Sequence, residues 1–235
     1  MGYAKRPQDA APPKELIRSL EELNQLPGTS VAIVSGRSRA DLEMWFGKLP
    51  KLWLAAEHGA IMRSPASMNW EHFGPNGAAE WKARVLPVLD HFVDRTPGSL
   101  IEEKEFSVVW HYRMADPEFG EWLANELVSN LEQMLAETHI RAVKGEKFVE
   151  VKVVWARKGE VFARMTGGQA APAFLLAAGD DPTDEDLFAQ LPDYAWTIHV
   201  GRTPSAARYR LSQPGEMRNL LRSFARLGTR ISLVA

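Results

Sequence analysis

The stretch 175–188, Leu-Leu-Ala-Ala-Gly-Asp-Asp-Pro-Thr-Asp-Glu-Asp-Leu-Phe, constrains the fold of this chain more than any other segment. A short apolar run, which predicts a buried strand, ends in glycine and a burst of carboxylates, and an amphipathic pattern then begins. The order strand, acidic loop, helix is typical of an open α/β sheet, in which ligands bind at the carboxyl ends of the strands. We therefore expect the carboxylates of Asp180, Asp181 and Asp184 to converge at such an edge.

Clustered carboxylate oxygens suit a hard cation, and Mg²⁺ is usually held by one or two carboxylates with waters and a substrate phosphate. Helix capping and the helix dipole also favour acidic and hydroxyl side chains in a first turn, and they suffice to explain Thr183, Asp184 and Glu185. They leave the adjacent Asp180 and Asp181 unexplained, because like charges repel unless a positive group lies between them. The sequence therefore favours a magnesium site formed by Asp180, Asp181 and Asp184.

The remainder of the chain alternates between two patterns. Continuous apolar runs at 31–34 and 52–56 predict strands of a parallel sheet that are buried on both faces. From about residue 64 the order becomes helix, two strands, helix, two strands, which is α+β in character. We predict an α/β core made of residues 1–63 and 154–235, with an αββαββ domain of residues 64–153 inserted into it.

Composition excludes several classes of function. The net charge of −2 and the dispersed lysines and arginines argue against a nucleic-acid partner. The chain has no cysteine, which excludes disulfides, thiolate metal sites and a cysteine nucleophile. No segment reads as a targeting sequence or as a membrane span, so we expect no membrane partner and a cytoplasmic protein.

Two further residues indicate a phosphate site. Ser35 ends the strand at 31–34, and Gly36 allows the backbone to approach a ligand, so a phosphate oxygen could bind there. Taken alone, however, Ser35 is better explained by simple helix capping. Lys158 opens a helix, where the dipole disfavours a positive charge, and neutralising a phosphate would account for it. A serine at one strand end, a lysine at a helix start and paired aspartates at the next strand end together indicate a phosphate site more specifically than any one of them.

Five segments carry a resemblance to a known family. They are Val-Ala-Ile-Val-Ser-Gly-Arg at 31–37, Glu-His-Gly at 57–59, Glu-Glu-Lys at 102–104, Trp-His-Tyr-Arg at 110–113 and Gly-Asp-Asp-Pro-Thr-Asp-Glu-Asp at 179–186. With Lys158 they resemble the trehalose-6-phosphate phosphatases of the haloacid dehalogenase superfamily. The resemblance implies a Rossmann-like core with an inserted α+β cap, Mg²⁺ as cofactor, a sugar phosphate as substrate, and association with a trehalose-phosphate synthase domain.

The same resemblance implies roles for individual residues. Ser35 and Lys158 would hold the phosphoryl oxygens, and Asp180 and Asp184, with Asp181 beside them, would hold Mg²⁺. Residues implied to bind the substrate, in the core and in the cap, are Arg37, Glu57, His58, Glu102, Lys104, Arg113 and Glu150, with His111 as a further candidate.

One motif of the superfamily is absent from the sequence. Asp-x-Asp-Gly-Thr, which supplies the nucleophilic aspartate and the acid/base at the end of the first core strand, has no counterpart here. We therefore expect the first core strand to be missing, Met1 to be an artefactual start, and the chain as it stands to be inactive. The alternatives are a phosphatase for another sugar phosphate and a non-catalytic domain that binds a sugar phosphate or a partner.

Overall fold

A computed structural model describes residues 11–65, 67–74, 78–167 and 172–231. The chain divides into two compact units, which we call the core unit and the cap unit. The core unit contains the described parts of residues 11–72 and 157–231, and the cap unit those of 73–156. The first division thus falls after His72 and the second after Ala156, later in the chain than the boundaries that the sequence predicts.

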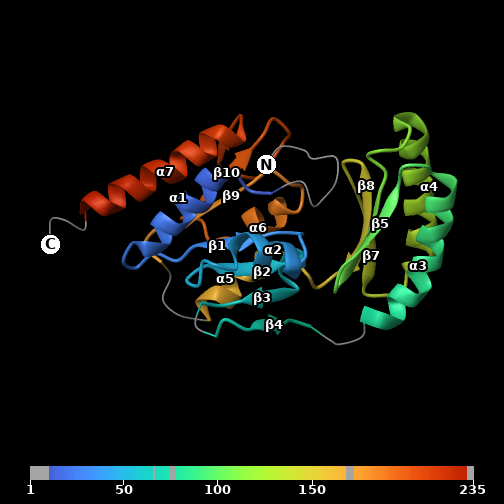
Figure 1. The fold of residues 1–235 in the computed structure, drawn as a ribbon, viewed down its shortest axis with the longest axis horizontal. Coiled ribbons are helices and arrows are strands. Elements are labelled where there is room, and N and C mark those ends of the chain that lie inside the picture. The colour runs from blue at the N-terminus through green and yellow to red at the C-terminus, as the bar shows by residue number, and fades with distance from the viewer. Residues whose placement is uncertain (1–10, 66, 75–77, 168–171, 232–235) are drawn as a thin grey trace. The chain divides into compact units, whose positions relative to one another are not determined.

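The core unit has helices interleaved with short strands. Its helices are α1 (Lys14–Gln25), α2 (Arg39–Phe46), α5 (Gly159–Thr166), α6 (Asp184–Gln190) and α7 (Pro214–Ile231), with a 3₁₀ turn at Glu57–Gly59. Its strands are β1 (Ala32–Val34), β2 (Trp53–Ala56), β3 (Ile61–Arg63), β4 (Trp70–His72), β9 (Leu176–Gly179), β10 (Trp196–Val200) and β11 (Tyr209–Leu211). Figure 1 shows α1 and α7 side by side, and the two helices pack against each other.

The core strands form two sheets. One has the order β1-β2-β3-β4, with β1 and β2 parallel and the two remaining pairs antiparallel, and the other is the parallel sheet β11-β10-β9. Each sheet has one of the predicted buried strands at its outer edge, β1 in the first and β9 in the second. Both strands are only partly buried, contrary to the predictions for 31–34 and for 175–178, because no other described strand pairs with their outer edges.

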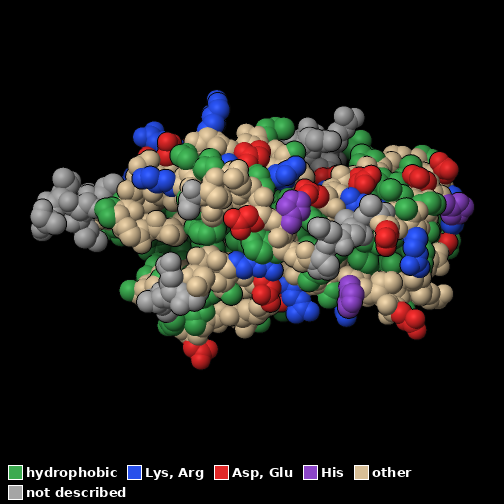
Figure 2. All heavy atoms as spheres, turned by 90° about the horizontal axis from the view of Figure 1, so that it is seen from below, with side chains coloured by type: hydrophobic (Ala, Val, Ile, Leu, Met, Phe, Trp, Pro, Cys, Tyr) green, Lys and Arg blue, Asp and Glu red, His purple; other side chains and the backbone are tan. Residues whose placement is uncertain are grey.

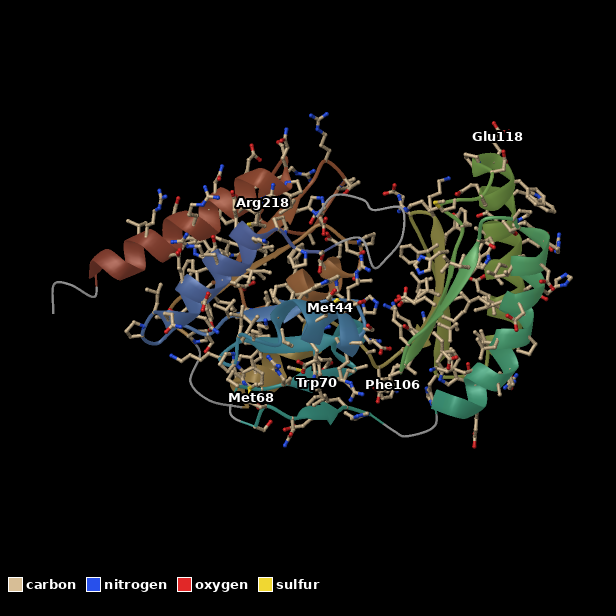
Figure 3. All side chains as sticks on the ribbon, viewed as in Figure 1. Met44, Met68, Trp70, Phe106, Glu118 and Arg218 are labelled. Atoms are coloured by element: carbon tan, nitrogen blue, oxygen red, sulfur yellow. The ribbon has the colours of Figure 1, made fainter. Side chains whose placement is uncertain are left out.

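The antiparallel strands β3 and β4 explain why the first division falls after His72. Trp70 on β4, labelled in Figure 3, donates its indole N–H to Glu43 of α2, with 2.6 Å between the nitrogen and Oε1. The buried Arg63 of β3 donates to both oxygens of the same carboxylate at 3.2 Å. Residues 70–72 are therefore held to the core by pairing and by a shared carboxylate.

The cap unit has the predicted order αββαββ. It consists of α3 (Ala78–Arg95), β5 (Leu100–Glu103), β6 (Ser107–His111), α4 (Pro117–Leu135), β7 (Ile140–Gly145) and β8 (Phe148–Val153). The antiparallel sheet has the order β5-β6-β8-β7, and both helices pack on it (Figure 1). Leu123, Leu127 and Leu131 lie on the buried face of α4, and a fully buried Trp110 meets Phe92 of α3 edge to face, so the core of this unit lies between sheet and helices.

No described helix combines the length and the apolar character needed to cross a membrane. On the face seen in Figure 2, acidic and basic side chains are interspersed, and the basic ones form no continuous field there.

Candidate active site

Ser35 lies directly after β1, at the carboxyl end of the strand. Its N–H donates to the Ala55 carbonyl at 2.9 Å, which continues the pairing with β2, and its own carbonyl accepts from the N–H of His58 at 2.9 Å. Its hydroxyl oxygen accepts from the N–H of Arg37 at 3.2 Å. The hydroxyl is thus held in a tight turn at the end of the strand, where the sequence predicts a ligand.

Glu57 and His58 follow β2 and are bonded to the same turn. The Glu57 N–H donates to the carbonyl of Arg37 at 3.0 Å. Both residues are buried and have positive φ values, 47° and 62°, which non-glycine residues rarely adopt. The His58 ring lies so close to Gly36 that a Cβ on this glycine would come within 2.7 Å of ring atom Cε1. This strained turn brings a buried carboxylate and a buried imidazole next to Ser35.

Lys158 and Asp184 form a buried ion pair. The distance from Nζ to Oδ1 is 2.8 Å, and the exposed fractions of the two side chains are 6% and 9%. The second oxygen of Asp184 accepts from the N–H of Asp181 at 2.9 Å. A Cβ at Gly179 would overlap the Asp184 carboxyl group, so glycine is needed at the end of β9 for this arrangement. The lysine at the start of α5 is thereby fixed beside the acidic loop.

Asp181 lies in this same network. One of its oxygens accepts from both the N–H and the hydroxyl of Thr183, at 2.8 and 2.7 Å. Burial acts to raise the pKa of the Asp181 carboxyl, but the positive charge of Lys158 and the two bonds from Thr183 outweigh it, and the pKa is lowered. His58 acts in the same direction, which places the 3₁₀ turn within electrostatic reach of the acidic loop.

The predicted metal ligands are only partly brought together. Asp181 and Asp184 are joined through one backbone N–H, whereas Asp180 is exposed. Within residues 11–65, 67–74, 78–167 and 172–231, no three acidic or histidine side chains form a group that could hold a metal ion. The donor chemistry of this loop nevertheless fits a hard cation, since its side chains offer mainly carboxylate oxygens.

The candidate residues of the cap lie on one face of its sheet. Glu102 and Glu150 are both registered opposite Val109, so the two side chains share a face. Glu102 contacts His111, with 2.8 Å between Oε2 and Nε2, and Lys104 donates to Glu150 at 3.4 Å. The Lys104–Glu150 pair is buried, with exposed fractions of 8% and 6%, so it is not a solvated surface pair.

Arg113 lies at a different place from these pairs. It follows β6 and donates to the backbone carbonyl of Glu146 in the turn between β7 and β8, at 3.0 Å. Its guanidinium group also forms an ion pair with the carboxylate of Glu146, with 3.9 Å between Nη1 and Oε1.

The structure adds two lysines that the sequence reasoning did not single out. Lys152 lies 4.0 Å from Glu150, and the alternation of strand β8 alone could have placed the two on one face. Lys82 of α3 is buried and donates to the carbonyl of Lys104 and, at 3.1 Å, to the carboxylate of Glu103. No local sequence pattern indicates a role for Lys82, because its partners Glu103 and Lys104 are 21 and 22 residues away along the chain.

Comparisons with known proteins find relatives of this chain in sequence and in structure. The family model for trehalose-phosphatase matches residues 2–214. A bifunctional trehalose-6-phosphate synthase/phosphatase from Thermoproteus tenax is 36% identical over 92% of this chain and 29% of its own length. A trehalose-phosphatase from Zygosaccharomyces rouxii is 35% identical over 80% of this chain and 23% of its own length. The chain thus spans only about a quarter of the length of the curated relatives it matches.

Solved structures agree with the sequence comparison. The C-terminal domain of the Candida albicans trehalose-6-phosphate phosphatase aligns with a TM-score of 0.88 and 28% identity, over 95% of this chain and 87% of that chain. A haloacid dehalogenase-like hydrolase from Bacteroides thetaiotaomicron, at 11% identity and a TM-score of 0.66 over 92% of each chain, shares the fold alone. The fold is therefore the predicted haloacid dehalogenase-like one, and the chain belongs to the trehalose-phosphatase family.

Proposed function

We propose that this chain provides the phosphate-binding and sugar-binding residues of a phosphatase that hydrolyses trehalose 6-phosphate to trehalose and phosphate. The observation that carries the proposal is the buried Lys158–Asp184 pair beside the ionised Asp181, within the electrostatic reach of His58. A buried charge network of this kind, at the carboxyl ends of strands, is typical of a functional site.

In the core unit, Ser35 and Lys158 bind the phosphoryl oxygens. The ammonium group of Lys158 has three donors, of which Asp184 accepts one, and a phosphate dianion can accept another. The Ser35 hydroxyl accepts from Arg37 and can donate its own proton to a phosphoryl oxygen. Arg37, Glu57 and His58 complete the turn that orients Ser35 and contribute to binding of the substrate.

Mg²⁺ would be held by Asp180 and Asp184, with Asp181 beside them. Each carboxylate oxygen of Asp184 already accepts one hydrogen bond and retains a second lone pair for a cation. The lowered pKa of Asp181 keeps negative charge in the loop at neutral pH. When bound, the ion would neutralise the charge of the phosphoryl group and orient it.

In the cap unit, Glu102, Lys104 and Glu150 bind sugar hydroxyl groups by charge-assisted hydrogen bonds. His111 orients Glu102 through their 2.8 Å contact. Arg113, bonded to Glu146, lies at the edge of this set.

We further propose that the chain as given binds its substrate without normal turnover. The sequence contains no Asp-x-Asp-Gly-Thr motif, and loss of a nucleophile typically leaves a small residual rate. The same observation favours a second candidate, a non-catalytic sugar-phosphate-binding domain that acts in association with a trehalose-phosphate synthase domain in the cytoplasm. Relatives named as synthases, such as one from Dictyostelium discoideum with 39% identity over 83% of this chain, support such an association.

Calorimetric binding and phosphate release separate these candidates. We expect the chain to bind trehalose 6-phosphate more tightly than glucose 6-phosphate, and a version extended by a strand carrying Asp-x-Asp-Gly-Thr to release phosphate in the presence of Mg²⁺. Asp184→Asn in the extended version should abolish release. Binding without release in both versions would favour the non-catalytic domain, and absence of binding would overturn both candidates. Turnover by the chain as given would show that another carboxylate acts as nucleophile, Asp181 being the first to test.

A further inference from the structure

Ser107 is a buried hydroxyl on the charged face of the cap sheet. It begins β6, directly after Phe106, which Figure 3 labels. Only 1% of the residue is exposed, and its Oγ has no hydrogen-bond partner among the described residues. A buried hydroxyl without a partner costs free energy, so native proteins usually satisfy such groups with protein, water or a ligand.

The sheet register places Ser107 among three charged side chains. Lys152 lies directly opposite it on β8, and Glu150, two residues along the same strand, shares that face. Lys104 is joined to Ser107 by a backbone bond of 2.9 Å and donates its ammonium group to Glu150. The Ser107 side chain therefore shares a face of the sheet with Glu150 and Lys152, next to the Lys104–Glu150 pair.

The chemistry of this cluster selects the class of ligand. Two ammonium groups donate, one carboxylate accepts, and the serine hydroxyl can do both. A sugar hydroxyl also donates and accepts, and so it can satisfy every member of the set. A phosphate dianion offers acceptors alone, so it can bond to the two ammonium groups but has no proton to donate to Glu150, which makes the cluster less complementary to phosphate than to a sugar.

We propose that the Ser107 hydroxyl binds directly to a hydroxyl group of a polyhydroxylated ligand, and that Lys152 contributes to the same subsite. The inference rests on the proposed function, because it adds a contact to the sugar-binding face described above. The inference goes beyond the proposed function because it assigns a role to Ser107, a neutral residue that lies outside the charged sequence motifs.

The test compares Ser107→Ala with Ser99→Ala in the full chain. Ser99 is a matched control, because its hydroxyl oxygen is also buried without a described partner, but the residue precedes β5 and is not paired with the strand that carries Glu150 and Lys152. Calorimetry with trehalose 6-phosphate should show about tenfold weaker binding for Ser107→Ala and no change for Ser99→Ala. Binding of glucose 6-phosphate should change less, because this ligand has fewer hydroxyl groups.

Thermal unfolding separates a binding role from a structural one. Removing an unpaired hydroxyl should leave the midpoint of Ser107→Ala unchanged or raise it. Ser107→Cys, which keeps a similar volume with a weak donor, should also bind weakly. Unchanged affinity in both variants, with the wild-type chain binding normally, would overturn this inference alone. A wild-type chain that binds no trehalose 6-phosphate would overturn the proposed function and this inference together.

Discussion

The core unit and the cap unit both bury charged pairs, but they build them in different ways. In the core, Lys158 and Asp184 come from the starts of two helices, and backbone N–H groups and a required glycine complete the arrangement. In the cap, the register of β8 places Glu150 on one face of the sheet, and Lys104, which directly follows β5, donates to it from the neighbouring turn. Backbone geometry thus fixes the candidate phosphate site, whereas side-chain register fixes the candidate sugar site.

The largest expected effect comes from breaking the core pair. Lys158→Ala should lower the free energy of unfolding by about 3–5 kcal/mol, because it leaves the Asp184 carboxylate buried without its counter-charge. Urea unfolding measures this. Arg18→Ala, which breaks an exposed pair with Glu22, is the control and should change stability by less than about 1 kcal/mol. Equal effects of the two substitutions would show that the core pair is not buried as described.

A second substitution tests the backbone of the core site. Gly179→Ala should cost about 1–3 kcal/mol, because the new methyl group would overlap the Asp184 carboxyl group. Gly215→Ala, in the first turn of α7, is the matched control, since the nearest atom to a new Cβ lies 3.8 Å away. Chemical denaturation should find the control neutral or slightly more stable. A neutral Gly179→Ala would contradict the required close approach.

In the cap, Lys82→Met tests the support of the β5–β6 turn. It should lower stability by about 1–3 kcal/mol, because the Lys104 carbonyl loses a buried donor. Trehalose 6-phosphate should bind more weakly, while glucose 6-phosphate binding changes less. Lys144→Met, which removes partly exposed contacts with Glu121 and Asn125, should leave affinity unchanged. Equal affinities for the two variants would exclude a positioning role for Lys82.

The smallest expected effect is the pH dependence of Asp181. Since its pKa is lowered in the folded chain, its charge stabilises the fold above the unfolded pKa of about 4, and this contribution is lost as the pH falls through the folded value. The stability difference between the wild-type chain and Asp181→Asn should therefore shrink below about pH 4. Thermal unfolding at a series of pH values checks this, and a difference that grows on acidification would contradict the assigned direction.

The sequence predicts the two architectures well, for a physical reason. The period of the apolar residues changes where the fold changes, so the αββαββ order and the strand at 175–178 follow from local patterns. The sequence pattern predicts that residues 70–72 belong to the cap, whereas the structure has them as β4 of the core unit. Trp70 is held there by a hydrogen bond to Glu43, and a contact between such distant segments leaves no local pattern in the sequence. Partial burial of β1 likewise depends on its neighbours in the sheet, which a run of apolar residues does not specify.

The residues of the candidate sites also fall into two groups, those that a local sequence pattern indicates and those that depend on distant contacts. The acidic loop and Ser35 are recognisable because strand ends and helix starts have local signatures. Lys82 and Ser107 are not, because their significance depends on partners across a helix and across a strand. The sequence predicts that three carboxylates converge, but it does not indicate that the N–H of Asp181 donates to Asp184 or that Asp180 is exposed.

The most direct test of the two-site account is a set of four affinities. Ser35→Ala and Glu102→Gln are each titrated with trehalose 6-phosphate and glucose 6-phosphate in a calorimeter, beside the wild-type chain. We predict that Ser35→Ala weakens both ligands by a similar factor, about five- to tenfold, whereas Glu102→Gln weakens trehalose 6-phosphate selectively. Equal losses for both ligands in both variants, or a selective loss in Ser35→Ala, would contradict the separation of phosphate binding from sugar binding.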